Sequence, residues 1–331
     1  MKNLYVHIGF PRTATKTLQF NLFKRHKDIN YIGRFPNRYL SHNNIIFKIF
    51  EFSDQQFKKN FKELSDEFKN LPLSSSKPNV LSDEFFLLNH ILHQNIHIKD
   101  SIHRLNELCK SNYINLKIIY SVRNQLDAIS SLIPLTFLSS LRTNCDKIIL
   151  TLNETSPDKY TTHFLNGYNY NFLHETLLKI VGTDNLNVIF YEKLIDFKEE
   201  YSDDISKILN ISSPETLNLL NKPRIHKRFD QIMTRSNLSS KSQLVYFQLK
   251  KLRLHKIFKK DFVYKSIIFF KKKILYNNFD KKEISLNREN LKKFMINLTK
   301  NRKLVKNYFL ESNKEFFKIN NTHKSIKKFY L

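Results

Sequence analysis

Residues 6–19 are Val6-His7-Ile8-Gly9-Phe10-Pro11-Arg12-Thr13-Ala14-Thr15-Lys16-Thr17-Leu18-Gln19. This order predicts a short apolar strand, a tight basic loop rich in hydroxyl groups, and the start of a helix. Backbone amides, a helix N-terminus and fixed positive charge would then point at one spot, which is a favourable place for a phosphate or sulfate group. A loop of this kind after the first strand indicates an α/β nucleotide-binding domain.

The rest of the chain supports that fold class. Short apolar runs predict strands at 4–8, 79–82, 116–121 and 187–191, with a weaker one at 30–33. Helical patterns lie between them, near 15–27, 55–70, 84–94, 101–111, 125–132, 172–181 and 203–209. Buried strands that alternate with helices favour a three-layer α/β/α fold with a mostly parallel sheet of about five strands.

Length and composition narrow the class of protein. With 331 residues, 41% of them hydrophobic, the chain can bury a large core. No apolar run is long enough to predict a membrane-spanning helix, and a signal peptide would have to consume the loop. The two cysteines, Cys109 and Cys145, match neither a disulfide framework nor a zinc site. We therefore expect a cytoplasmic protein with reduced thiols.

Positive charge is concentrated toward the C-terminus. The formal net charge is +26, and residues 241–331 contain 25 Lys and Arg against 6 Asp and Glu. Lysine-rich helical patterns cover roughly 239–258, 262–276 and 285–318. We predict two parts: a nucleotide-binding domain at 1–236 and a basic helical extension at 237–331 packed on it. Such basic helices add the expectation of contact with an anionic membrane at its inner face.

Segment 11–17 resembles the 5′-phosphosulfate loop of the sulfotransferases that use 3′-phosphoadenosine 5′-phosphosulfate as donor. The family's loop is Pro-Lys-(Ser/Thr)-Gly-Thr-Thr, and here it is Pro11-Arg12-Thr13-Ala14-Thr15-Lys16, followed by Thr17. Arg12 replaces the usual lysine and still offers a two-pronged oxyanion clamp. Ala14 replaces a glycine, so the loop must tolerate a Cβ there. The resemblance implies that these residues hold the donor's 5′-phosphate.

A second segment, 116–131, is similar to the family's 3′-phosphate motif. That motif has an arginine at the end of a strand and a serine eight positions later, and Arg123 and Ser131 occupy those places. A guanidinium at a strand end and a hydroxyl on the following helix can grip one phosphate together. The two segments come in the family's order, and each follows a predicted strand.

Three further stretches extend the resemblance. Residues 80–84 are similar to a strand ending in Ser-x-Glu, whose glutamate is the catalytic base in several branches, which gives Glu84 that role. Residues 189–194 and 208–211 resemble the family's Tyr-Glu-Asp-Leu and Phe-Leu-Gly segments, and residues 308–313 resemble a Ser-Asn stretch of bacterial members. The similarity is greatest to the bacterial branch that acts on glycans.

Together these features imply transfer of a sulfuryl group from the donor to a hydroxyl of a sugar, polysaccharide or glycolipid. Arg12 and the loop amides would stabilise the charge that builds on the departing phosphate, and Glu84 would accept the hydroxyl proton. The reaction requires no metal. Arg224, Lys227 and Arg228 are further candidates for contact with the donor.

Histidines and one more glutamate receive structural interpretations. We expect His7 to be packed and hydrogen-bonded in its strand rather than catalytic, and Glu192 to pair with a neighbouring group. His90, His93 and His97 share one face of a predicted helix. That spacing could hold a metal, but we expect the histidines to line a polar groove or solvent.

Two alternatives remain open at this point. The first is a P-loop kinase, although the glycine expected before Lys16 is missing and the spacing from Gly9 is one residue too long. The second is a non-catalytic basic protein that binds a membrane or nucleic acid through residues 244–276. We expect a glycan or glycolipid acceptor as the partner, and not nucleic acid.

Overall fold

A computed structural model of the chain describes residues 2–10, 12–33, 52–83, 85–92, 97–136, 159–223, 301–320 and 324–331, with isolated residues at 45, 48, 49, 151, 152, 296 and 300. Within this part a five-stranded sheet has the order β2-β3-β1-β4-β5, and every pair of neighbouring strands is parallel. The strands are β1 Lys2–Gly9, β2 Asn30–Gly33, β3 Asn79–Ser82, β4 Ile114–Val122 and β5 Leu186–Phe190. All five predicted strands are therefore confirmed.

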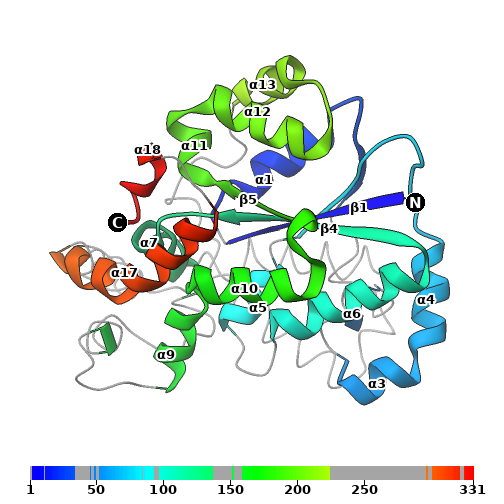
Figure 1. Cartoon of the computed structure of the whole chain (residues 1–331), viewed down its shortest axis with the longest axis horizontal. Helices are drawn as coiled ribbons and strands as arrows, with labels where there is room; N and C mark the ends of the chain where they lie inside the picture. Colours follow the sequence, from blue (N-terminus) through cyan, green and yellow to red (C-terminus); the bar gives the residue numbers. More distant parts are fainter. Residues whose placement is uncertain are drawn as a thin grey trace, which may run out of the picture.

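Helices cover both faces of the sheet, which confirms the α/β/α prediction (Figure 1). One face carries α4 Phe61–Lys69, α5 Phe85–Leu92, α6 Ile98–Ser111, α10 Tyr170–Val181 and α17 Arg302–Ile319. The other carries α1 Thr15–Thr17, the π-helix η1 Leu18–Phe23, α12 Lys198–Leu209 and α13 Ser213–Asn221. The remaining helical segments are α3 Asp54–Lys59, α7 Gln125–Thr136, α9 Lys159–Asn166, the short 3-10 helix η2 Thr183–Asn185, α11 Tyr191–Asp196 and α18 Lys324–Lys327.

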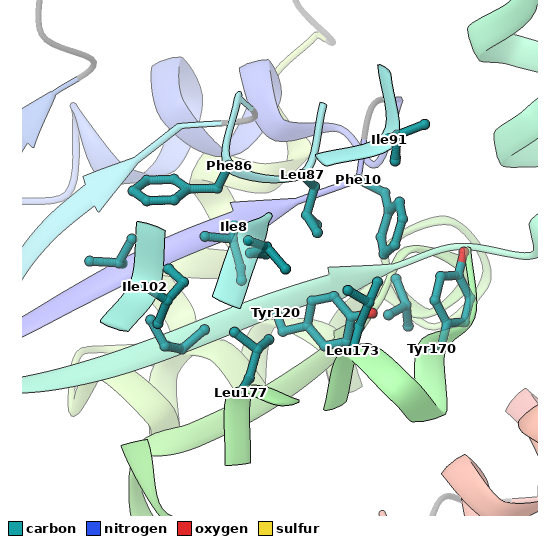
Figure 2. Packing of buried hydrophobic residues seen from close by; sticks show 14 of the residues in the cluster. Ile8, Phe10, Phe86, Leu87, Ile91, Ile102, Tyr120, Tyr170, Leu173 and Leu177 are labelled. Atoms are coloured by element: carbon teal, nitrogen blue, oxygen red, sulfur yellow. The ribbon is translucent and has the colours of Figure 1, made fainter. Parts of the chain in front are cut away.

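Alternation along the central strands sends side chains into two separate cores. Leu4, Val6 and Ile8 of β1 lie in the larger core, whereas Tyr5 lies in the smaller one. The larger core packs Ile8 and Phe10 against Tyr120 of β4 and residues of α5 and α10 (Figure 2). Each large apolar side chain that is fully buried contributes about 2 kcal/mol. Apolar residues on both faces explain why the strands look continuously hydrophobic in the sequence.

Local capping sets several helix ends. Ser53 and Gln56 form a reciprocal capping box at α3, and Asn169 caps α10 by accepting from the amide of Phe172. At α13, Ser212 caps the helix and a proline follows in its first turn.

The C-terminal part contributes to the larger core. Val305, Phe309, Phe316 and Phe317 of α17 are buried there. Of the predicted C-terminal helices, 239–258 and 262–276 lie outside the described residues, as does the boundary at 236. The division into two domains therefore stays a prediction. No helix in the described part of the chain is long and apolar enough to cross a membrane.

Strand order places a switch point beside the central strand. Chain connections run from β1 outward to β2 and back to β3, and then pass over β1 to reach β4 and β5. In open parallel sheets, ligands bind outside the carboxyl ends of the strands at such a point. Gly9 of β1 is paired with Ser121 of β4, so both predicted site segments leave the sheet at this edge.

Candidate active site

The loop after β1 has an unusual backbone. Arg12 and Ala14 both adopt positive φ angles, 73° and 59°, in the left-handed region that suits glycine. The loops that this segment resembles have a glycine at the place of Ala14. In this chain Ala14 has the left-handed backbone that glycine adopts without strain, although it carries a Cβ. Strain of this kind is typical of loops whose shape serves binding.

Close packing holds the loop against the end of β1. A Cβ on Gly9 would lie 2.5 Å from Thr15 Oγ1 and 2.8 Å from Thr13 Oγ1, so only glycine fits there. Thr13 donates both its amide and its hydroxyl to the carbonyl of Phe10, at 3.2 and 2.7 Å. The three threonines of the loop are buried, and the hydroxyls of Thr13 and Thr15 lie 3.5 Å apart.

The helix that follows begins without a side-chain cap. Ala14 occupies the N-cap position and has no group that could accept a hydrogen bond from the first-turn amides. The helical backbone continues from α1 into η1, which satisfies later amides but not those of the first turn. An anion at this point would take the place of the missing cap.

Arg123 joins the two predicted segments. Its Nη1 donates to the carbonyl oxygen of Arg12 at 3.1 Å and to Ser131 Oγ at 3.3 Å. Its guanidinium carbon lies 4.6 Å from the centre of the Tyr191 ring, a cation–π arrangement that fixes the plane of the fork. Tyr170 donates its hydroxyl to the carbonyl of Arg123. The predicted residues Arg12, Arg123 and Ser131 therefore meet at one place.

A buried network of polar side chains joins the strand that precedes the loop 9–17 to its neighbours. His7 Nδ1 lies 2.8 Å from Ser82 Oγ, and its Nε2 lies 2.7 Å from Ser121 Oγ, which links β1 to both neighbouring strands. Gln19 Nε2 donates to the carbonyl and the hydroxyl of Ser82 at 2.9 and 3.2 Å. Burial lowers the pKa of His7 to about 3, so the imidazole is neutral. His7 is packed and hydrogen-bonded in its strand, as predicted.

Glu192 pairs with neighbouring groups. It accepts from the amide of Asn124 at 2.8 Å and from the hydroxyl of Tyr330 at 2.7 Å. Burial raises the pKa of Glu192, and these two hydrogen bonds partly offset the rise. This contact joins α11, the Arg123 turn and the segment after α18. Sequence reasoning gave Asn124 no role of its own, although it lies in the segment 116–131, and it did not find Tyr330, which belongs to no local motif.

Some predicted residues lie outside the described part of the chain. These are Pro11, the proposed base Glu84, His93 and the candidates Arg224, Lys227 and Arg228. Before Glu84, β3 ends at Ser82, and the amide of Asp83 donates to the carbonyl of His7 at 3.1 Å. Lys16 is half-buried on α1.

The described residues gather three metal-ligating side chains away from this edge, at His26, Asp28 and Glu215. Glu215 already accepts from the amide of Lys27 at 3.4 Å, and the amide of Asp28 donates to His26 Nδ1 at 3.2 Å. Together with the ion pair between Lys27 and Glu215, these contacts explain why the three side chains lie close to one another. Separately, His163 Nε2 lies 2.9 Å from the carbonyl oxygen of His90, so this histidine pair is linked through the backbone.

Comparison with known proteins gives similarity in structure only. No family model and no curated protein matches this chain. The solved sulfotransferase from Alicyclobacillus acidocaldarius is 13% identical, with a TM-score of 0.40 over 74% of this chain and 96% of that one. The sulfotransferase domain from the curacin biosynthetic pathway is 14% identical, with a TM-score of 0.37 over 69% of this chain and 81% of that one. What the present site can bind therefore has to be argued from its own residues.

Proposed function

We propose that this protein is a sulfotransferase that uses 3′-phosphoadenosine 5′-phosphosulfate. The observation that carries the proposal is the contact of Arg123 Nη1 with both the carbonyl of Arg12 and the hydroxyl of Ser131. The two segments that resemble the family's 5′- and 3′-phosphate motifs thus lie together at the switch point of the sheet. One nucleotide with phosphates at both positions fits that arrangement of charge.

Each segment has a distinct task in this proposal. The uncapped first turn of α1 offers amides to the 5′-phosphosulfate, and its dipole favours the negative charge. Arg123 and Ser131 present a guanidinium and a hydroxyl to the 3′-phosphate. The left-handed residues Arg12 and Ala14 hold the loop in this shape before the ligand arrives, which lowers the entropic cost of binding.

Sulfuryl transfer then proceeds in line. The acceptor oxygen forms a bond to sulfur while the bond from sulfur to the bridging oxygen breaks. The acceptor's proton passes to the carboxylate of Glu84, and adenosine 3′,5′-bisphosphate departs with the electron pair of the broken bond. Arg12 and the loop amides stabilise the charge on the departing phosphate.

Binding of the product nucleotide tests the proposal. Titration calorimetry should show adenosine 3′,5′-bisphosphate binding at micromolar concentration and ATP with Mg²⁺ binding far more weakly. Preference for ATP with Mg²⁺ would indicate a kinase and overturn the assignment. Transfer of labelled sulfate from the donor to a panel of cell-envelope extracts would then identify the acceptor, for which we propose a sugar, polysaccharide or glycolipid hydroxyl.

Glu84 has its own test. Glu84→Gln should lower kcat by about a thousandfold while the affinity for adenosine 3′,5′-bisphosphate stays unchanged, because the side chain acts on the acceptor. Glu63→Gln, on the exposed surface of α4, is the matched control. Turnover near the wild-type rate would remove Glu84 from the base role.

A further inference from the structure

Three residues from the C-terminal part of the chain contact the Arg123 turn and its support; we call Asn313, Phe329 and Tyr330 the clasp. Asn124 donates its side-chain amide to the carbonyl of Phe329. Gln125 Nε2 donates to Asn313 Oδ1 at 2.7 Å, and Asn313 Nδ2 donates in turn to the carbonyl of Tyr330 at 3.3 Å. With the Tyr330–Glu192 bond, the clasp holds both residues that directly follow Arg123.

Burial makes these contacts specific. Tyr330 and Asn313 are each 1% exposed, Gln125 is 3% exposed and Glu192 is 6% exposed. In such a dry environment, each polar group that loses its partner costs its full desolvation energy. Alternative positions of the turn would leave several groups unpaired, so the hydrogen-bonded arrangement is strongly preferred.

The clasp is connected to Arg123 along two short routes. One runs through the backbone, because Asn124 is bonded on its amide by Glu192 and on its side chain by Phe329. The other runs through α11, because Glu192 follows Tyr191 in this helix, and the Tyr191 ring packs against the Arg123 guanidinium. Through Glu192, Tyr330 therefore affects both the backbone of Asn124, which follows Arg123, and the Tyr191 ring against which the Arg123 guanidinium packs.

We propose that Tyr330, acting through Glu192, is a positioning residue that gives the site its selectivity for a nucleotide with a 3′-phosphate. The inference rests on the proposed function, since it assigns the 3′-phosphate to Arg123 and Ser131. It adds Tyr330, which no sequence motif includes. Asn313 of α17 and residues 329–330 thereby become components of the nucleotide site.

Two nucleotides separate positioning from general stability. Adenosine 3′,5′-bisphosphate and AMP share the 5′-phosphate and differ at the 3′ position. The dissociation constant of AMP divided by that of the bisphosphate therefore measures 3′-selectivity. Tyr330→Phe removes one hydroxyl and keeps the ring, and it should lower this ratio about fivefold. Glu192→Gln should lower it in the same direction, and it serves if the tyrosine variant does not fold. Tyr201→Phe, a buried tyrosine in the smaller core, should leave the ratio unchanged.

A double-mutant cycle then tests the route of action. In an Arg123→Ala background, Tyr330→Phe should have no further effect on selectivity, because the group that it positions is gone. An unchanged ratio in Tyr330→Phe, or an equal weakening of both nucleotides, would overturn the inference and leave the proposed function standing. A wild-type protein that does not prefer the bisphosphate would overturn both.

Discussion

The two halves of the candidate site are built differently. In the loop 9–17, Thr13 bonds locally to Phe10, and the contact with Arg123 reaches only the carbonyl of Arg12. In the Arg123 turn, the partners come from distant parts of the chain, including Tyr170, Glu192 and Phe329. The loop thus depends on backbone shape and close packing, and the turn depends on assembly of the whole fold.

Substitution of Gly9 should have the largest effect. Gly9→Ala places a Cβ against two threonine hydroxyls at 2.5 and 2.8 Å, so the loop must move. We expect a loss of about 2 kcal/mol in the free energy of unfolding and about a hundredfold loss of affinity for adenosine 3′,5′-bisphosphate. Urea denaturation and calorimetry measure the two.

Gly182→Ala is the matched control, because its Cβ would meet nothing within 4 Å although φ is +81°. With φ 81° and ψ 165°, its backbone lies in a region essentially restricted to glycine, so the substitution should cost about 2 kcal/mol of stability but leave nucleotide affinity intact. If the two variants had the same affinity for the nucleotide, close packing at Gly9 would not shape the loop.

Arg123→Lys tests the other half of the comparison. Lysine keeps the charge but loses the fork that reaches both the Arg12 carbonyl and Ser131. Affinity for the bisphosphate should fall about thirtyfold, with AMP much less affected. Arg104→Lys removes a buried fork that bonds Ile49 and Asp54, and it should change stability alone. Full affinity in Arg123→Lys would mean that charge suffices at this position.

Lowering the pH should destabilise the protein through His7, which is hydrogen-bonded to Ser82 and Ser121. The native pKa of His7 is about 3 and the unfolded pKa is near 6.5. Between these values the unfolded chain binds a proton that the native protein does not, so stability falls as pH falls below 6.5. The slope from this group is about 1.4 kcal/mol per pH unit. Unfolding in urea from pH 7 to pH 4 measures it.

His7→Gln should remove that part of the slope, since a neutral amide takes up no proton. His103→Gln, on the exposed face of α6, is the control and should keep the slope. The same slope in His7→Gln as in wild type would place the acid sensitivity elsewhere.

The smallest effect concerns the two alanines of the chain. Ala14→Gly relieves a residue at φ 59° and should raise the free energy of unfolding by about 1 kcal/mol. Ala128→Gly, inside α7, should lower it by at least about 1 kcal/mol. Thermal denaturation shows whether each substitution raises or lowers the stability of the protein. A destabilised Ala14→Gly would mean that loop entropy outweighs the relieved strain.

Local patterns predicted the sheet well because buried parallel strands leave unmistakable apolar runs. They also placed α6, α7 and α10 close to their observed bounds. The helices at 159–166, 191–196 and 213–221 were not predicted, because they are short and carry weak periodicity. The predicted helix at 15–27 forms, but it ends at Phe23 and is largely a π-helix, which side-chain spacing cannot distinguish.

The same contrast holds in the site. Arg12, Arg123 and Ser131 could be singled out because each sits in a segment whose local order carries meaning. Tyr330 could not, and Asn313 stood out only as part of the stretch 308–313, because the contacts that matter come from partners 138 and 188 positions away. A tyrosine that donates to a buried glutamate has no signature in its neighbours.

The distance along the chain between the clasp and its partners also has a consequence for biosynthesis. The ribosome releases the strands of the sheet, ending with β5 at Phe190, long before residue 330 emerges. During that interval Glu192 and Asn124 lack the tyrosine and the carbonyl that complete their bonding. A nascent chain would therefore form the loop 9–17 early and complete the hydrogen bonds around Arg123 only after residue 330 has left the ribosome.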